Sequence, residues 1–440
     1  MIDRMALEKG IDILKPPDFY REAHQVIFEV LLSLGERGEP VDIVTSQEEL
    51  RTRGQLDAIG GTEYLMALID SVPTAANIEY YAHIVEEKSI LRRLIDASTQ
   101  ISGMSHGQVE DANALVDQAE RMIFQVAQRR MGQNFTRLDT LAYEAFEKIE
   151  KQYQEKLGIS GLETGFKELD FITSGLQPSD LIIVAARPSM GKTALVMDIA
   201  RHVSVHQKKP VAVFSLEMSK EQLAIRLICS ESRVDSHRVR TGYVPDKDWP
   251  QLSNGVARLY EAPMFIDDGT DVSPLQMRGK CRRLKAEHGL SLIVIDYLQL
   301  MQSGSRRAEN RTQEIAEIAR ALKGLARELQ VPVIALSQLS RAVEQRPDKR
   351  PMLSDLRESG SIEAEADVVM FIYREAYYKS KEIVSDDGSE PSTGEGSEPD
   401  NTAEIIIGKQ RNGPTGTIKL AFMQKFACFE NLDSHRKDFE

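Results

Sequence analysis

The chain has 440 residues, a length that predicts two or three domains. Its formal net charge is −13, so any contact with nucleic acid must be made by a local group of residues and not by the overall charge. No apolar run reaches the ~20 residues of a membrane span, and the N-terminus has no basic-then-apolar signal, which argues against a membrane or exported protein. The three cysteines, Cys229, Cys281 and Cys428, form no C-x-x-C pair, which argues against a zinc module or a disulfide framework and favours a reducing cytoplasm.

Residues 1–130 are predicted to form a helical interaction domain, because apolar residues recur at helical spacing and no catalytic motif is present. Ser46 and Glu49 form a capping-box pattern that predicts the start of one helix. A longer helix is expected over 77–102. Its apolar residues are expected to form a stripe: Ile84, Ile90, Leu91, Leu94 and Ile95.

Residues 131–161 are predicted to be a linker with one amphipathic helix. Six apolar residues fall on one face of this helix: Leu138, Leu141, Ala142, Phe146, Ile149 and Tyr153. Such a face needs a partner surface, either on its own chain or on a neighbouring subunit.

Residues 162–435 alternate between apolar strands and amphipathic helices, which predicts an α/β domain with a mostly parallel sheet. Strands are expected at 181–186, 211–216, 291–296, 331–336 and 367–373. In such sheets, ligands bind at the carboxyl ends of the strands. The segment 385–401 has no large apolar residue and is expected to be a disordered surface insertion.

A phosphate-binding loop is predicted where the first strand meets a helix. Its residues are Ala186, Arg187, Pro188, Ser189, Met190, Gly191, Lys192 and Thr193. In this pattern backbone N–H groups cradle the phosphates, the lysine reaches the β- and γ-phosphates and the threonine hydroxyl ligates Mg²⁺. Ala186 stands where the general pattern has its first glycine. The sequence therefore predicts a site for a nucleoside triphosphate.

Three later strands end in polar residues. Asp296 ends an apolar strand of the Walker B form and is expected to hold Mg²⁺ opposite Thr193. Glu217 can accept a hydrogen bond from the attacking water, and Gln338 can sense the γ-phosphate. Taken singly, each residue could also be an ordinary strand-end side chain.

The segment 408–416 joins two strand-like runs, 403–407 and 417–422, and its Asn-Gly-Pro sequence predicts a tight turn. The turn does not explain Lys409 and Arg411, which precede it. They could reach a neighbouring subunit's γ-phosphate as a finger pair, or they could form a salt bridge within their own subunit. Two loops are candidates for nucleic-acid contact. One contains Arg306, Arg307 and Arg311, and the other covers 339–361, where basic and acidic residues nearly balance.

The ordered motifs resemble those of the bacterial DnaB-type replicative helicases over nearly the whole chain. The matching strings are DFYREAHQ (18–25), VPTAAN (72–77), ARPSMGKT (186–193), FSLEMS (214–219), VIDYLQL (294–300), ALSQLSR (335–341), RESGSIE (357–363) and KQRNGPTG (409–416). The resemblance implies a ring-shaped homohexamer of RecA-like ATPase domains with a helical N-terminal collar. It also implies ATP and Mg²⁺ as cofactors, 5′-to-3′ unwinding at the replication fork, and a nucleoid-associated cytoplasmic protein with a primase and a helicase loader as partners.

The same resemblance assigns Lys192, Thr193, Glu217, Asp296 and Gln338 to one subunit's ATP site. It implies that Lys409 and Arg411 complete the neighbour's site and that the linker helix docks on the adjacent subunit. Arg357, Glu358 and Gly360 match the loop that holds single-stranded DNA in the channel.

Family members carry more residues before the segment matching Ile11–Tyr20, so the first collar helix is expected to be missing. One alternative is a RecA-like recombination or repair ATPase, which the helical N-terminal part argues against. A second alternative is an ATP-gated scaffold without unwinding, which Glu217 argues against.

Overall fold

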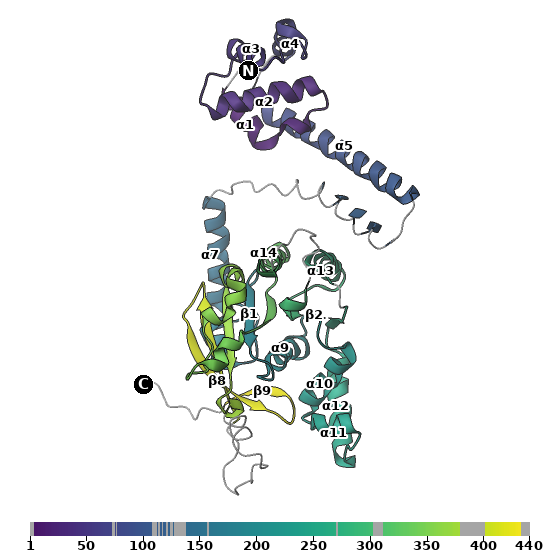
Figure 1. Cartoon of the computed structure of the whole chain (residues 1–440), viewed down its shortest axis with the longest axis vertical. Helices are drawn as coiled ribbons and strands as arrows, with labels where there is room; N and C mark the ends of the chain where they lie inside the picture. The colour runs from purple at the N-terminus through teal and green to yellow at the C-terminus, as the bar shows by residue number, and fades with distance from the viewer. Residues whose placement is uncertain are drawn as a thin grey trace. The chain divides into compact units, whose positions relative to one another are not determined.

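The computed structural model describes residues 4–72, 77–107, 138–155, 158–269, 272–301, 311–378 and 401–432, with a few isolated positions between them (Figure 1). The chain separates into two compact units, Met1–Leu138 and Asp139–Glu440. The expected insertion at 385–401, apart from its last residue, lies outside the described residues. Within the described ranges, no helix is long and apolar enough to cross a membrane.

The first unit is helical, as its residue spacing predicts. Its elements are α1 (Arg4–Ile13), the 3-10 helix η1 (Pro16–Asp18), α2 (Glu22–Glu36), α3 (Ile43–Thr52), α4 (Gly61–Asp70) and α5 (Ile78–His106). Val30, Leu50 and Leu65 are fully buried in its core. Asp18 is also buried, and its carboxylate accepts a 2.9 Å hydrogen bond from Ser89 Oγ and pairs with Arg93, so it ties η1 to α5.

The capping box predicted at Ser46 and Glu49 was wrong, because helix α3 begins earlier. Asp42 is the N-cap, and its Oδ1 accepts hydrogen bonds of 2.9 Å from the backbone N–H groups of Val44 and Thr45. These contacts satisfy two of the free N–H donors of the first turn, and Ser46 is fully buried within the helix.

The predicted apolar stripe on α5 is present but does not face the core of this unit. Ile84, Leu91, Leu94 and Ile95 are all 40% or more exposed. The buried face of α5 carries small residues instead, namely Ala82, Ser89 and Ala97. The linker helix α7 (Leu138–Glu155) likewise exposes Leu138, Leu141, Phe146 and Ile149. Neither stripe is therefore covered by the described residues of its own unit.

The second unit contains a sheet whose described strands lie in the order β3-β2-β4-β5-β1-β6-β7-β8-β9. The first six strands of this order pair in parallel and the remaining pairs are antiparallel. The strands are β1 (Leu181–Ala186), β2 (Val211–Ser215), β3 (Met264–Asp267), β4 (Leu292–Asp296), β5 (Val333–Gln338), β6 (Val368–Tyr373), β7 (Thr402–Gln410), β8 (Gly416–Met423) and β9 (Cys428–Asn431). The mostly parallel sheet is confirmed, as are the five predicted strands and the two strand-like runs at 403–407 and 417–422; β3 and β9 were not predicted.

The helices of this unit cover both faces of the sheet. They are α8 (Lys167–Thr173), α9 (Lys192–Arg201) with a π-helical turn η3 (His202–His206), α10 (Lys220–Ser232), α11 (Ser236–Thr241), α12 (Trp249–Tyr260), α13 (Pro274–His288), α14 (Arg311–Leu329) and α15 (Gly360–Glu365). Short 3-10 helices are η4 (Asp246–Asp248), η5 (Leu298–Leu300), η6 (Arg341–Gln345) and η7 (Leu353–Ser359).

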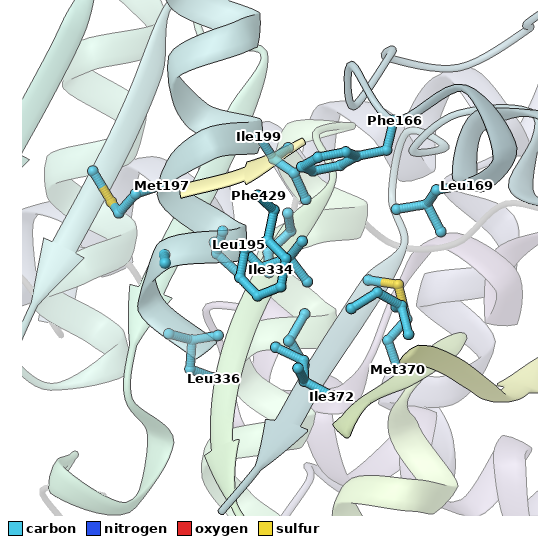
Figure 2. Packing of buried hydrophobic residues seen from close by; sticks show 14 of the residues in the cluster. Phe166, Leu169, Leu195, Met197, Ile199, Ile334, Leu336, Met370, Ile372 and Phe429 are labelled. Atoms are coloured by element: carbon cyan, nitrogen blue, oxygen red, sulfur yellow. The ribbon is translucent and has the colours of Figure 1, made fainter. Parts of the chain in front are cut away.

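Alternate residues of each central strand point to opposite faces, and each face buries its own cluster. Ile182 and Val184 pack with residues of α8, α9 and α10, whereas Ile183 packs with residues of α13 and α14. Figure 2 shows the first cluster, in which Leu195 and Ile199 of α9 lie beside Phe429 of β9. The strands are buried on both faces, which explains their nearly continuous apolar sequences.

Candidate functional site

The site residues predicted at strand ends converge because their strands are parallel neighbours. Ala186, the last residue of β1, is in register with Gln338 at the end of β5. On the next pair, Ser215 of β2 is in register with Asp296 of β4. Glu217 lies two residues after the end of β2. The final residues of β1, β5, β2 and β4 therefore lie at one edge of the sheet. We refer to this as the carboxyl edge.

The phosphate-binding loop crosses the carboxyl edge between β1 and α9. Ser189 and Gly191 have φ angles of 67° and 98°, the left-handed region that turns the chain back towards the helix start. A Cβ on Gly191 would lie 2.9 Å from Phe429 Cζ, so packing also requires glycine there. Pro188 and Ser189 are exposed, while Ala186 and Met190 are buried. The free N–H groups at the start of α9 can bind phosphate oxygens.

Arg187 lies in this loop, but its side chain does not face the phosphate position. It is 8% exposed, and its Nε donates a 2.8 Å hydrogen bond to Glu344 Oε1. Its Nη1 donates at 2.8 Å to the carbonyl of Leu339. The guanidinium therefore fastens the loop to the segment that follows β5, and only the backbone of Arg187 is placed to bind a nucleotide.

Thr193 and Asp296 form the pair expected for a metal site. Thr193 Oγ1 donates a 2.8 Å hydrogen bond to Asp296 Oδ2, and Asp296 is only 2% exposed. Asp296 Oδ1 is buried and has no partner among the described residues. Burial raises the pKa of Asp296, while the Thr193 hydrogen bond and the Lys192 charge lower it. An unpaired buried carboxylate oxygen beside a hydroxyl fits Mg²⁺ or a water bound to it.

Lys192 is the cation of this edge. Its Nζ lies 4.8 Å from the centroid of the Tyr297 ring, within the range of a cation–π contact. Burial lowers the pKa of Lys192, and the negative charges of Asp296 and Glu217 oppose that shift. Glu217 itself is exposed, so its carboxylate is accessible to solvent water beside the cation. The Lys192 ammonium, which lies near the Asp296 and Glu217 carboxylates, is therefore the cation that a bound phosphate would meet in this part of the site.

Gln338 stands at the end of β5 and is held through its backbone. Its N–H donates a 3.3 Å hydrogen bond to Gln299 Oε1, and Gln299 Nε2 donates at 2.9 Å to Ser337 Oγ. Gln299, which sequence reasoning missed, thus joins the segment after β4 to the end of β5. No sequence signal marked it, because its role depends on which strands are neighbours. The Gln338 side chain is exposed at the carboxyl edge.

Arg374 is a second residue that sequence reasoning missed. It follows β6, its Nη1 donates a 3.3 Å hydrogen bond to the Ser189 carbonyl, and its guanidinium carbon lies 4.0 Å from the Phe422 ring centroid. Burial lowers the pKa of Arg374. Glu217 and Asp296 were predicted because they are polar residues at the ends of predicted strands. Arg374 directly follows the predicted strand 367–373, so the same criterion would have identified it.

Lys409 and Arg411 do not lie at the carboxyl edge of their own chain. Arg411 Nη1 lies 3.2 Å from Asp367 Oδ1, and Asp367 precedes β6 and pairs through its N–H with Leu181, the first residue of β1. They therefore lie at the amino edge, the opposite end of the sheet. The intrasubunit salt bridge is present for Arg411, whereas Lys409 Nζ donates at 2.5 Å to the carbonyl of Glu363.

The expected DNA-contact residues lie at the end of η7 and the start of α15. Arg357 and Glu358 belong to η7 and Gly360 begins α15, but their side chains lie outside the described residues, as do Arg306 and Arg307. Arg311 is described, and its Nη2 donates a 2.7 Å hydrogen bond to the carbonyl of Gln299.

Comparisons with known proteins agree with this architecture. The family model "DnaB-like helicase C terminal domain" matches residues 161–431, and "DnaB-like helicase N terminal domain" matches residues 1–87. The chain is 50% identical over 432 residues to the replicative DNA helicase DnaB of Geobacillus stearothermophilus, covering 98% of this chain and 92% of that protein. It is 48% identical over 433 residues to the replicative DNA helicase DnaC of Bacillus subtilis, with the same coverage of both chains.

Solved structures give the same result. A DnaB-like replicative helicase, described together with its interactions with primase, superposes with a TM-score of 0.73 at 32% identity, covering 98% of this chain and 100% of that one. The ATPase domain of G40P superposes with a TM-score of 0.61 at 38% identity, covering 68% of this chain and all of that domain.

Proposed function

Because this chain belongs to the DnaB family of replicative helicases, we propose that it uses ATP hydrolysis to move along single-stranded DNA and unwind the duplex at the replication fork. The observation that carries this proposal is the Thr193–Asp296 pair at the carboxyl edge, with Glu217 nearby; the second carboxylate oxygen of Asp296 has no partner in the described part of the chain. A binding scaffold without turnover needs no such combination of metal ligand, cation and exposed carboxylate.

The roles of the edge residues follow from their chemistry. The backbone of the loop 186–193 and the start of α9 bind the phosphates of ATP, and Lys192 leaves the Tyr297 ring to contact them. Thr193 and Asp296 hold Mg²⁺, which supplies charge neutralisation for the phosphates when it is bound. Glu217 accepts a hydrogen bond from the attacking water, and Gln338 reports the state of the γ-phosphate to the segment after β5.

Lys409 and Arg411 act on the nucleotide of a neighbouring subunit. Their place at the amino edge supports this, because a finger in the same chain would have to span the sheet from one end to the other. A guanidinium placed against the γ-phosphate stabilises the charge of the transition state. We therefore propose a homohexameric ring with ATP sites between subunits. The exposed apolar stripes of α5 and α7 support contacts with other subunits, and α7 is the docking helix.

The proposed function also assigns a role to each domain, to the DNA-contact residues and to the partners. Residues 1–130 form the collar, 131–161 the linker and 162–435 the motor. One DNA strand is held in the channel by its backbone, through Arg357, Glu358 and Gly360. The ring moves along this strand in the 5′-to-3′ direction, and the protein acts in the nucleoid. Primase and a loader are the partners. The DnaB-like helicase that superposes over 98% of this chain is described with its primase interactions, which supports primase as a partner here. No observation favours the recombination ATPase or the scaffold.

Mixing two inactive variants tests the shared ATP site. Glu217→Gln removes the residue that one subunit gives to the site, and Arg411→Ala removes the residue that its neighbour gives. If Arg411 acts in trans, about one quarter of the interfaces in a one-to-one mixed ring have an intact Glu217 on one side and an intact Arg411 on the other. ATP turnover should recover to about that fraction. A mixture that stays as inactive as its parents would contradict sites shared between subunits.

A further inference from the structure

Asp367 holds Arg411 at two points. It is 4% exposed and lies directly before β6 at the amino edge. Its Oδ1 pairs with Arg411 Nη1 at 3.2 Å, and its backbone carbonyl accepts a 2.9 Å hydrogen bond from the Arg411 N–H. Its Oδ2 accepts hydrogen bonds from the Leu181 N–H at 2.8 Å and from Lys323 Nζ. The carboxylate thus connects the Arg411 turn to the start of β1.

The C-terminal end of α15 holds both basic residues of the turn. Lys409 Nζ donates to the Glu363 carbonyl at 2.5 Å, and Arg411 Nη2 donates to the Ala364 carbonyl at 2.7 Å. Carbonyls in the last turn of a helix lack partners within the helix and favour nearby cations. The two side chains therefore cap the same helix end.

A β-bulge directs the two side chains to this position. Val369 pairs with Lys409 but Met370 pairs with Ile407, so Gly408 is an extra residue in β7. A Cβ on Gly408 would lie 2.6 Å from Phe371 Cε2, so only glycine allows this close approach. Bulges redirect the side chains that follow them. The orientation of Lys409 and Arg411 is thus set by the local backbone as well as by their partners.

Helix α15 is short and begins at Gly360, inside the segment proposed to hold DNA. The same helix therefore has the DNA-contact segment at its start and the carbonyls that hold Lys409 and Arg411 at its end. A rigid helix of one or two turns transmits a shift at one end to the other.

We propose that Asp367 is a positioning residue that, together with the end of α15, aims Arg411 and Lys409 at the neighbouring nucleotide, and that DNA contact at the start of α15 adjusts this aim. The inference rests on the proposed function, since it requires the trans role of Arg411. Misplacement of a catalytic group by about 1 Å costs about 100-fold in rate, so small shifts of this helix end are enough to regulate turnover.

A double-mutant cycle tests the positioning role in the full-length chain. Asp367→Asn keeps the side-chain size and an oxygen acceptor, and it should lower DNA-stimulated ATP turnover about tenfold with unchanged affinity for a fluorescent ATP analogue. In an Arg411→Ala background the same substitution should have no further effect, because its action passes through Arg411. Asp170→Asn is the matched control, since Asp170 is also buried but bonds to Thr164.

The outcomes distinguish a failure of the positioning role of Asp367 from a failure of the proposed helicase function. An equal loss from Asp367→Asn in both backgrounds would overturn the positioning role and leave the helicase proposal intact. Unchanged turnover in Arg411→Ala alone would overturn the finger and this inference with it. If Asp367→Asn does not fold, hydrogen exchange on the wild-type ring replaces it. Single-stranded DNA should then change protection in 360–367 and 409–416 together, and a change confined to the first segment would overturn the inference.

Discussion

The Thr193 hydroxyl donates a 2.8 Å hydrogen bond to the Asp296 carboxylate, although the two residues are 103 positions apart in the chain. The contact joins the first turn of α9 to the end of β4, because both elements meet at the carboxyl edge of the parallel sheet. One carboxylate oxygen is used by the threonine and the other has no partner among the described residues. This pair is the structural basis for the proposed Mg²⁺ site.

Asp296→Asn should remove the effect of Mg²⁺ on nucleotide binding. The neutral amide cannot balance the ion's charge, so Mg²⁺ should strengthen ATP binding at least tenfold less than in the wild type. Titration of a fluorescent ATP analogue with and without Mg²⁺ measures this effect. Binding in EDTA should be similar for both proteins, and an undiminished Mg²⁺ effect in the variant would place the ion elsewhere.

Glu217→Gln should abolish hydrolysis while leaving nucleotide binding intact. The amide cannot accept the water's proton, so ATP turnover should fall about 10²- to 10⁴-fold, with little change in affinity or melting temperature. Glu221→Gln is the control, because Glu221 lies in the first turn of α10 on the same segment and its carboxylate interacts with Ser219. Equal turnover in wild type and Glu217→Gln would remove Glu217 from its proposed role.

Much of the fold could be predicted from local patterns. Continuous apolar strands indicated the parallel sheet, and the polar residues after them marked the carboxyl edge. The capping box predicted at Ser46 was wrong because Asp42, four residues earlier, is the N-cap of helix α3. On α5 the periodicity was visible, but small residues rather than the large stripe face the core.

Contacts between distant segments were not predictable. The Gln299 contacts depend on β4 and β5 being neighbours, and the Arg187 contacts depend on where the chain runs after β5. The place of Lys409 and Arg411 at the amino edge required the antiparallel return of β7. By contrast, Arg374 could have been found, since it follows a predicted strand.

Arg187→Met should lower stability rather than remove a phosphate contact. The change deprives the Leu339 carbonyl of a charged donor and Glu344 of a cation, at a cost of about 1–3 kcal/mol. Thermal unfolding should therefore shift down by several degrees, with less than about a threefold change in ATP affinity. The opposite pattern, an unchanged melting temperature with affinity reduced at least tenfold, would show that the guanidinium contacts the nucleotide.

Asp180→Asn should stabilise the motor unit at neutral pH. Burial, with the nearby charge of Asp367, raises the pKa of Asp180 from 3.8 to about 6. The folded state therefore binds this proton more tightly than the unfolded state, so the contribution of Asp180 to wild-type stability falls as pH rises from about 4 to 6. At pH 7 the variant should gain about 1–3 kcal/mol, after allowance for partial exposure.

Melting temperatures of both proteins at pH 4, 5, 6 and 7 test this sign. The two curves should converge at the acid end and separate as Asp180 ionises. Exposed Asp246→Asn serves as the control and should run parallel to the wild type. A variant less stable than the wild type at pH 7 would mean that the Asp180 charge is favourable.

Strand displacement on a forked DNA with a 5′ tail tests the central claim most directly. The wild-type chain should separate the strands only when ATP and Mg²⁺ are present, and Arg411→Ala should lose this activity while remaining folded and able to bind ATP. Unwinding by Arg411→Ala at the wild-type rate, or hydrolysis by a wild-type hexamer that displaces no strand on any fork, would contradict the account.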